Sequence, residues 1–247
     1  MSNLIKAEWF RLRHEGSVLK IYIFTAFLAV VSQFVGDDGI KINALNYFLH
    51  CSIAICLSVT SAAGFITSTF NSRLVNYEIM KGTPPIQMIL SKLFVAITLV
   101  TVTYFIPSVI LIEIFDGKKL TLSMVMLLFV CVVKVTVMAL SICIIFKDAA
   151  GIVIFMLMFM MQTMPLVLLQ NLAGINVVPL TSYLTTTQLM LIGNLSMLDM
   201  EEMSMPLSTE HTGIKIIISC IMLIAVIIPL AHKSLKDKWE IKLTNAA

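Results

Sequence analysis

The chain has 247 residues, of which 59% are hydrophobic and only 13% are charged, and its formal net charge is +3. Soluble domains carry about 25% charged residues, so this composition and a mean hydropathy of +0.98 exclude an ordinary soluble domain. They predict a polytopic, all-α membrane protein. The small net charge gives no reason to expect nucleic acid as a partner. The five cysteines lie in apolar runs without metal-ligand spacing, so we interpret them as packing residues and expect no metal site.

The N-terminal segment 1–17 is predicted to form an amphipathic helix on the membrane surface. Ile5, Trp9 and Leu12 fall on one helical face. Aromatic side chains here would lie at the depth of the lipid headgroups, and the arginines would face anionic lipid. The alternative is a charged cap before the first span. The residues assigned to the interfacial helix are Trp9, Phe10, Arg11 and Arg13.

Six apolar runs follow and are predicted to span the bilayer, which needs roughly 20 apolar residues per helix. Their expected bounds are 18–35, 45–69, 88–112, 121–146, 149–169 and 214–231. With both termini on one side, that side carries twelve Lys and Arg residues and the other side carries four. The excess of positive charge predicts that both termini and the loop 70–92 are cytoplasmic.

Two features inside the spans bear on packing. Small and hydroxyl residues crowd the second span between Ser52 and Thr69, and such residues let helices approach closely. We interpret them as a helix–helix interface, with contact between two copies of the chain as one form of it; a substrate-lining face is the alternative. Pro107, Pro165 and Pro229 lie late in three spans and are expected to kink them.

The loop 70–92 is predicted to be a hairpin of a short helix, a sharp corner and a second helix. Gly82 stands where the end of a helix favours positive φ. Thr83 is expected to cap the second helix, and Pro84 to take its first position. A rigid polar hairpin suits docking of a soluble partner. Glu78 would pair with a cation of that partner or, alternatively, with Arg73 or Lys81. The residues assigned to this contact are Arg73, Tyr77, Glu78, Gly82, Thr83 and Pro84.

Lys134 is the one basic residue deep within a predicted span, and Ser141 falls on the same helical face. Inserting a lysine at mid-span costs roughly 2.5–3.5 kcal/mol, so we expect Lys134 to face protein or water. It either contacts an acidic partner or a substrate carboxylate, or lies in a wet crevice between subunits without a specific task. On this view, replacement by leucine would leave folding at least as favourable.

The long connection 170–213 carries four acidic residues and no lysine or arginine. Within it, Tyr183–Leu195 is too polar for a span. We expect an outer interfacial helix or a re-entrant hairpin that leans on the fifth and sixth spans, since structureless loops of this length are uncommon.

No glycine-rich phosphate loop is present, so ATP is not expected to bind this chain in the usual way. No catalytic residue and no cofactor is assigned to it.

The predicted six-span architecture and the loop pattern Glu78, Gly82, Pro84, Ser91 and Lys92 resemble the ABC-2 type permease subunits of bacterial ABC transporters. The opening stretch 3–13 is similar to the start of small permeases of peptide export and lantibiotic self-protection. The resemblance implies a single permease domain over 1–247, with an N-terminal elbow helix, a coupling hairpin at 70–92 and an outer or re-entrant helix between spans five and six.

The resemblance also implies the partners and the cargo of the protein. A separate ATPase subunit would bind ATP and magnesium, and a second permease copy or a related permease would complete the pore in the bacterial plasma membrane. The implied activity is export of a small amphipathic cargo such as an antimicrobial peptide. The alternative is an ion-coupled carrier or a membrane-embedded enzyme that acts without an ATPase.

Overall fold

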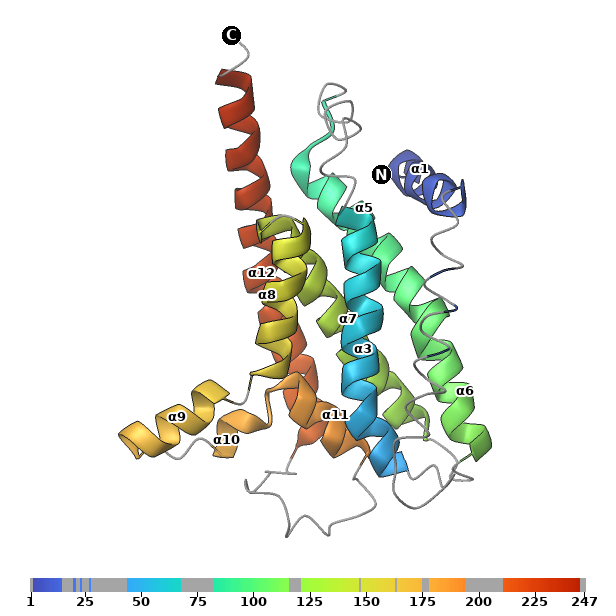
Figure 1. The fold of residues 1–247 in the computed structure, drawn as a ribbon, viewed down its shortest axis with the longest axis vertical. Helices are drawn as coiled ribbons and strands as arrows, with labels where there is room; N and C mark the ends of the chain where they lie inside the picture. The colour runs from blue at the N-terminus through green and yellow to red at the C-terminus, as the bar shows by residue number, and fades with distance from the viewer. Residues whose placement is uncertain are drawn as a thin grey trace.

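The computed structural model describes residues 2–14, 20, 23, 27, 44–67, 82–115, 121–146, 148–162, 164–174, 178–193 and 211–244. Every regular element in these ranges is helical, and the longer helices stand side by side in an upright bundle (Figure 1). The predicted all-α class is therefore confirmed for the described part of the chain.

Three of the described helical stretches are long and apolar enough to cross a membrane. They are Pro85–Ile110, Leu122–Phe146 and Thr212–Lys236, and they match the predicted third, fourth and sixth spans. Large apolar side chains such as Phe94 and Ile221 are exposed on their outer sides. A surface of this kind suits lipid better than water, so these helices support a membrane protein.

Two further apolar stretches are shorter, at Ile55–Thr67 and Ala150–Met160. The first belongs to α3 (Ala44–Thr67), which matches the predicted second span. The predicted first span, 18–35, lies outside the described residues except for Lys20, Ile23 and Phe27.

The helix α7 (Leu122–Phe146) packs against several other helices, namely α3, α5 (Pro85–Val100), α8 (Asp148–Met160) and α12 (Thr212–Thr244). Its contact with α8 is very close. A Cβ atom at Gly151 of α8 would lie 2.5 Å from the Cα of Cys143 in α7. Only glycine lets the two backbones meet at this distance.

The small residues of α3 form a helix–helix interface within the chain. Ala62 and Ala63 are buried, and α3 packs against α7 and α8. A Cβ atom at Gly64 would lie 2.6 Å from Cδ1 of Ile152 in α8. The predicted use of this stripe for close helix packing is confirmed inside one chain.

Pro107 and Pro229 are accommodated in different ways. Pro107 follows a wide π-helical turn, η2 (Thr101–Phe105), which leads into α6 (Ile106–Phe115). Proline has no N–H for the preceding turn, and such a wide turn accommodates the lost hydrogen bond. Pro229 lies inside α12, which continues through it to Thr244 and so exceeds the predicted range 214–231.

The predicted continuous span at 149–169 is wrong, because the helix breaks after Met160. The next helix, α9 (Met164–Ala173), leaves the bundle at a steep angle (Figure 1). Pro165, the second residue of α9, cannot donate to the carbonyl of Met161. Gln162 stabilises the break, since its Nε2 donates to the carbonyl of Phe159 at 2.8 Å and its Oε1 accepts the Thr185 N–H at 3.0 Å.

The segment after α9 returns to the bundle as α10 (Val178–Thr181) and α11 (Thr185–Gly193). A helix was predicted here, and α11 leans on α12 as expected. It also packs against α3 and α7, and Gln188 and Leu189 are fully buried. The predicted contact with the sixth span is therefore confirmed, and α3 and α7 are additional neighbours.

Different helices lie at the two ends of the bundle. The N-terminal helix α1 (Ser2–His14), the start of α5 and the C-terminal turns of α12 lie at one end, the upper one in Figure 1. The helices α9, α10 and α11 lie at the opposite end.

Candidate functional site

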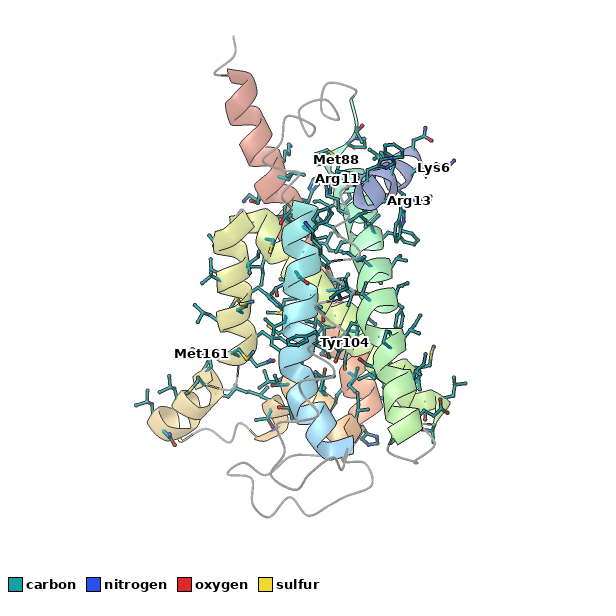
Figure 2. The ribbon with its side chains drawn as sticks, turned by 45° about the vertical axis from the view of Figure 1, so that its right-hand side comes forward. Lys6, Arg11, Arg13, Met88, Tyr104 and Met161 are labelled. Carbon is teal, nitrogen blue, oxygen red and sulfur yellow. The ribbon has the colours of Figure 1, made fainter. Side chains whose placement is uncertain are left out.

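The helix α1 presents two faces at the upper end of the bundle. Leu12 is fully buried, and Trp9 packs against the core. Phe10 is 65% exposed and its ring lies 3.9 Å, centroid to centroid, from that of His14. Lys6 points away from the bundle (Figure 2). Trp9 lies on the helical face predicted for it, with Ile5 and Leu12, and this face packs against the bundle, whereas Phe10 lies on the exposed face.

Glu8 forms a buried ion pair with Lys92, which lies 84 positions later in α5. The Nζ of Lys92 donates to Oε1 of Glu8, and both side chains are almost fully excluded from solvent. A buried charge is strongly destabilising unless it is paired, so each of these residues depends on the other. The pair fastens the middle of α1 to the second turn of α5.

Arg11 adds a second cation to this cluster. Its Nη2 lies 3.0 Å from Oε2 of Glu8, and its Cζ lies 5.5 Å from the ring centroid of Phe65 in α3. A guanidinium over an aromatic ring is attracted to the negative face of the ring. Arg11 was expected to face lipid, but it joins α1 to α3 instead. Arg13 is exposed, as an interfacial role requires.

Sequence reasoning missed Glu8 and used Lys92 only as part of a motif. A signal was present, because Glu8 falls on the same helical face as Ile5 and Leu12. An acidic residue on an apolar stripe needs a cation from another element.

The corner that precedes α5 is built by Gly82, Thr83 and Pro84. Gly82 has φ of +73°, which confirms the predicted need for glycine. The capping prediction is wrong by one position, because Pro84 is the N-cap residue, Pro85 begins the helix and no side chain caps it. The carbonyl of Pro84 accepts the Gln87 N–H at 3.0 Å. Arg73, Tyr77 and Glu78 lie outside the described residues.

Lys134 lies inside the bundle and is enclosed by oxygen atoms. Its Nζ donates three hydrogen bonds of 3.0 Å, to the carbonyl of Tyr183, to Oε1 of Gln188 and to Oγ of Ser219. An ammonium has three N–H groups, so these acceptors use all of them. The residue faces protein, as predicted, and its acceptors are neutral and belong to the same chain. It does not lie in a wet crevice between subunits.

Lys134 therefore joins three elements, α7, α11 and α12. Gln188 extends the cluster by donating from Nε2 to the carbonyl of Ser182 at 3.1 Å and to Oγ of Ser219 at 3.0 Å. Ser141 does not belong to it. Ser141 is fully buried, and its hydroxyl has no hydrogen-bond partner among the described residues.

Comparison with known proteins gives no match: no family model, no curated protein and no solved structure is similar to this chain.

Proposed function

We propose that this chain is the permease subunit of an ATP-driven exporter of the ABC-2 type, with both termini in the cytoplasm and with the short helix α8 as the fifth of six spans. The observation that carries the proposal is the gathering of α1, the Gly82–Pro84 corner and the end of α12 at one end of the bundle (Figure 1). The sequence-based topology assigns all three segments to the cytoplasm, so the fold and the charge distribution agree.

The corner has the mechanical properties that ATPase coupling needs. Gly82 permits the positive φ that the corner requires, and the two consecutive prolines Pro84 and Pro85 leave few conformations to the backbone that follows it. The helix that follows is one continuous apolar stretch of 26 residues, Pro85–Ile110. A force applied at the corner would therefore move a whole span, which in turn packs against α7.

The proposed cargo is a small amphipathic molecule such as an antimicrobial peptide, and this rests on the resemblance of the loop and the N-terminal stretch. The exposed apolar residues of α9, among them Leu168 and Leu172, lie at the end opposite the corner. In the proposed orientation they would face the outside, where an exported amphipathic molecule is released.

The test uses the gene next to that of this chain. We expect it to encode an ATPase with a phosphate loop, and we expect this ATPase to co-purify with the tagged chain. Gly82→Val and Glu78→Lys should each abolish co-purification while the chain still reaches the membrane.

Gly174→Val is a matched control for Gly82→Val. Gly174 also has positive φ, +62°, and a Cβ atom added at either glycine would meet no neighbouring atom within 4 Å. Gly174 ends α9 at the opposite end of the bundle, so Gly174→Val should retain the ATPase. Retention of the ATPase by both Gly82→Val and Glu78→Lys would refute the proposal.

A further inference from the structure

We infer that Glu8 and Lys92 are positioning residues that hold α1 and the first turns of α5 in one fixed relation and thereby set the direction of the Gly82–Pro84 corner. What the corner docks onto rests on the proposed function. The link between the two helices does not, because it stands on the contacts of the buried ion pair.

The ion pair restricts α1 in a way that apolar packing does not. Leu12 and Trp9 would keep contact with the core over a range of small rotations and shifts of α1. Glu8 and Lys92 are both buried, so any movement that separates them breaks an ion pair away from water and takes from Lys92 the carboxylate that offsets its charge. The pair therefore selects one register between α1 and α5.

Arg11 restricts the remaining freedom of α1. Glu8 is bound on one side by Lys92 of α5 and lies on the other beside Arg11, which reaches Phe65 of α3. Rotation of α1 about its own axis would break one of these contacts. Lys92 is two turns from Pro85, so the relation fixed here extends directly to the corner.

The exposed face of α1 relates the Glu8–Lys92 ion pair to the membrane surface. Phe10 and Arg13 are exposed there, and in the proposed orientation they meet the membrane surface. The level of α1 at that surface then determines where the corner stands relative to the bilayer. Glu8 and Lys92 would act through α5 on the docked partner, without touching it.

The first experiment measures the distance between α1 and α5 with paired spin labels. Arg13→Cys and Ile86→Cys place the labels on exposed positions of α1 and the first turn of α5, in a chain whose native cysteines are replaced by alanine and which is reconstituted in nanodiscs. We expect one narrow distance peak. Glu8→Gln and Lys92→Met should each lose this peak. The charge-swapped chain Glu8→Lys/Arg11→Glu/Lys92→Glu should recover it; Arg11 is inverted as well, because a lysine at position 8 would otherwise face its guanidinium.

Lys6→Met is the matched control, since it removes an exposed cation from the same helix and should keep the narrow peak. Persistence of the peak in both Glu8→Gln and Lys92→Met would overturn the inference. If Glu8→Gln or Lys92→Met does not accumulate in the membrane, the charge-swapped chain becomes the test. It should accumulate and show the narrow peak. Failure of the charge-swapped chain to accumulate or to show the peak would overturn the inference.

The second experiment separates this inference from the proposed function. Glu8→Gln should lower co-purification of the ATPase, and the charge swap should restore it. Unchanged ATPase binding in Glu8→Gln, while Gly82→Val abolishes it, would overturn the positioning role. Unchanged binding in Gly82→Val as well would instead count against the proposed function, and the distance peak would remain a valid test of the link.

Discussion

At the scale of single residues, the informative positions are the charged side chains that the bundle buries. Glu8, Lys92 and Lys134 are the buried charged residues within the described ranges. Glu8 and Lys92 offset each other's charge, whereas the Lys134 ammonium donates only to neutral oxygen atoms. The two arrangements solve the same problem, since a buried charge is tolerated only when its hydrogen-bonding capacity is used.

Replacement of Lys134 by leucine is expected to destabilise the protein. The change removes an insertion cost of roughly 2.5–3.5 kcal/mol, which led to the sequence-based expectation of equal or better folding. It also removes the Lys134 donor from the part-buried carbonyl of Tyr183 and from Oε1 of Gln188, which keeps only the Ser219 hydroxyl at 3.4 Å. A buried group that loses its partner costs about 1–3 kcal/mol. We therefore expect little loss at the insertion step and a lower midpoint of thermal unfolding in detergent.

The control for this prediction is Lys233→Leu, which changes an exposed lysine of α12 and should stay within about 0.5 kcal/mol of the parent chain. Thermal unfolding followed by tryptophan fluorescence reports both variants. A Lys134→Leu chain that unfolds at the same temperature as the parent would show that the three hydrogen bonds contribute no net stability.

The sequence identified Lys134 as unusual because one lysine in an apolar run is visible locally. Its acceptors were not predictable, because they come from residues 49, 54 and 85 positions away. The pairing of Glu8 with Lys92 is hidden for the same reason. Helical periodicity shows which face of a helix is buried, but it does not show which element covers that face.

At the scale of helices, apolar length predicted α7 to within one residue of the observed start, and predicted α3 and the start of α12 almost as well. The prediction of a fifth span was wrong because the run 149–169 is apolar over most of its length, and this pattern favours one continuous helix. Its break depends on Pro165 and on the capture of the Thr185 N–H by Gln162, which is a contact between distant segments. Pro165 could have indicated a break in the helix from the sequence alone, whereas the contact made by Gln162 could not.

Two glycines at the close contacts of α8, Gly151 and Gly64, allow the cost of an added methyl group to be compared. Gly151→Ala places a Cβ atom 2.5 Å from the backbone of Cys143, and the backbone of α7 cannot yield without moving the helix. Gly64→Ala meets only Cδ1 of Ile152, the end of a flexible side chain, at 2.6 Å. We expect Gly151→Ala to cost about 1–3 kcal/mol, as overpacking does, and Gly64→Ala to cost clearly less.

Thermal unfolding of the two alanine variants in the same detergent measures this difference. Equal midpoints for Gly151→Ala and Gly64→Ala would mean that α7 and α8 separate easily, against the close packing described here.

At the scale of the whole molecule, the two ends of the bundle give a topology that labelling can test. Single cysteines at Arg13 of α1 and Asn171 of α9 are both exposed and lie at opposite ends. In cells carrying a cysteine-free background, we expect a membrane-impermeant maleimide to label position 171 directly. Position 13 should react only after the membrane is permeabilised.

A cysteine at Lys233 serves as a second marker for the end that holds α1, and it should behave like position 13. Labelling of positions 13 and 171 from the same side would contradict the proposed arrangement of the termini.

The Lys134 cluster also has a consequence for the order in which the chain is made. All three acceptors of the ammonium lie after it in the sequence, and Ser219 is 85 positions further on. At a synthesis rate of about 5–20 residues per second, Lys134 precedes Ser219 from the ribosome by roughly 4–17 s. During that interval α7 must enter the bilayer on the strength of its apolar residues alone. Translation that stops before Tyr183 therefore leaves a membrane-inserted chain with an uncompensated charge, a defect that cellular quality control can detect.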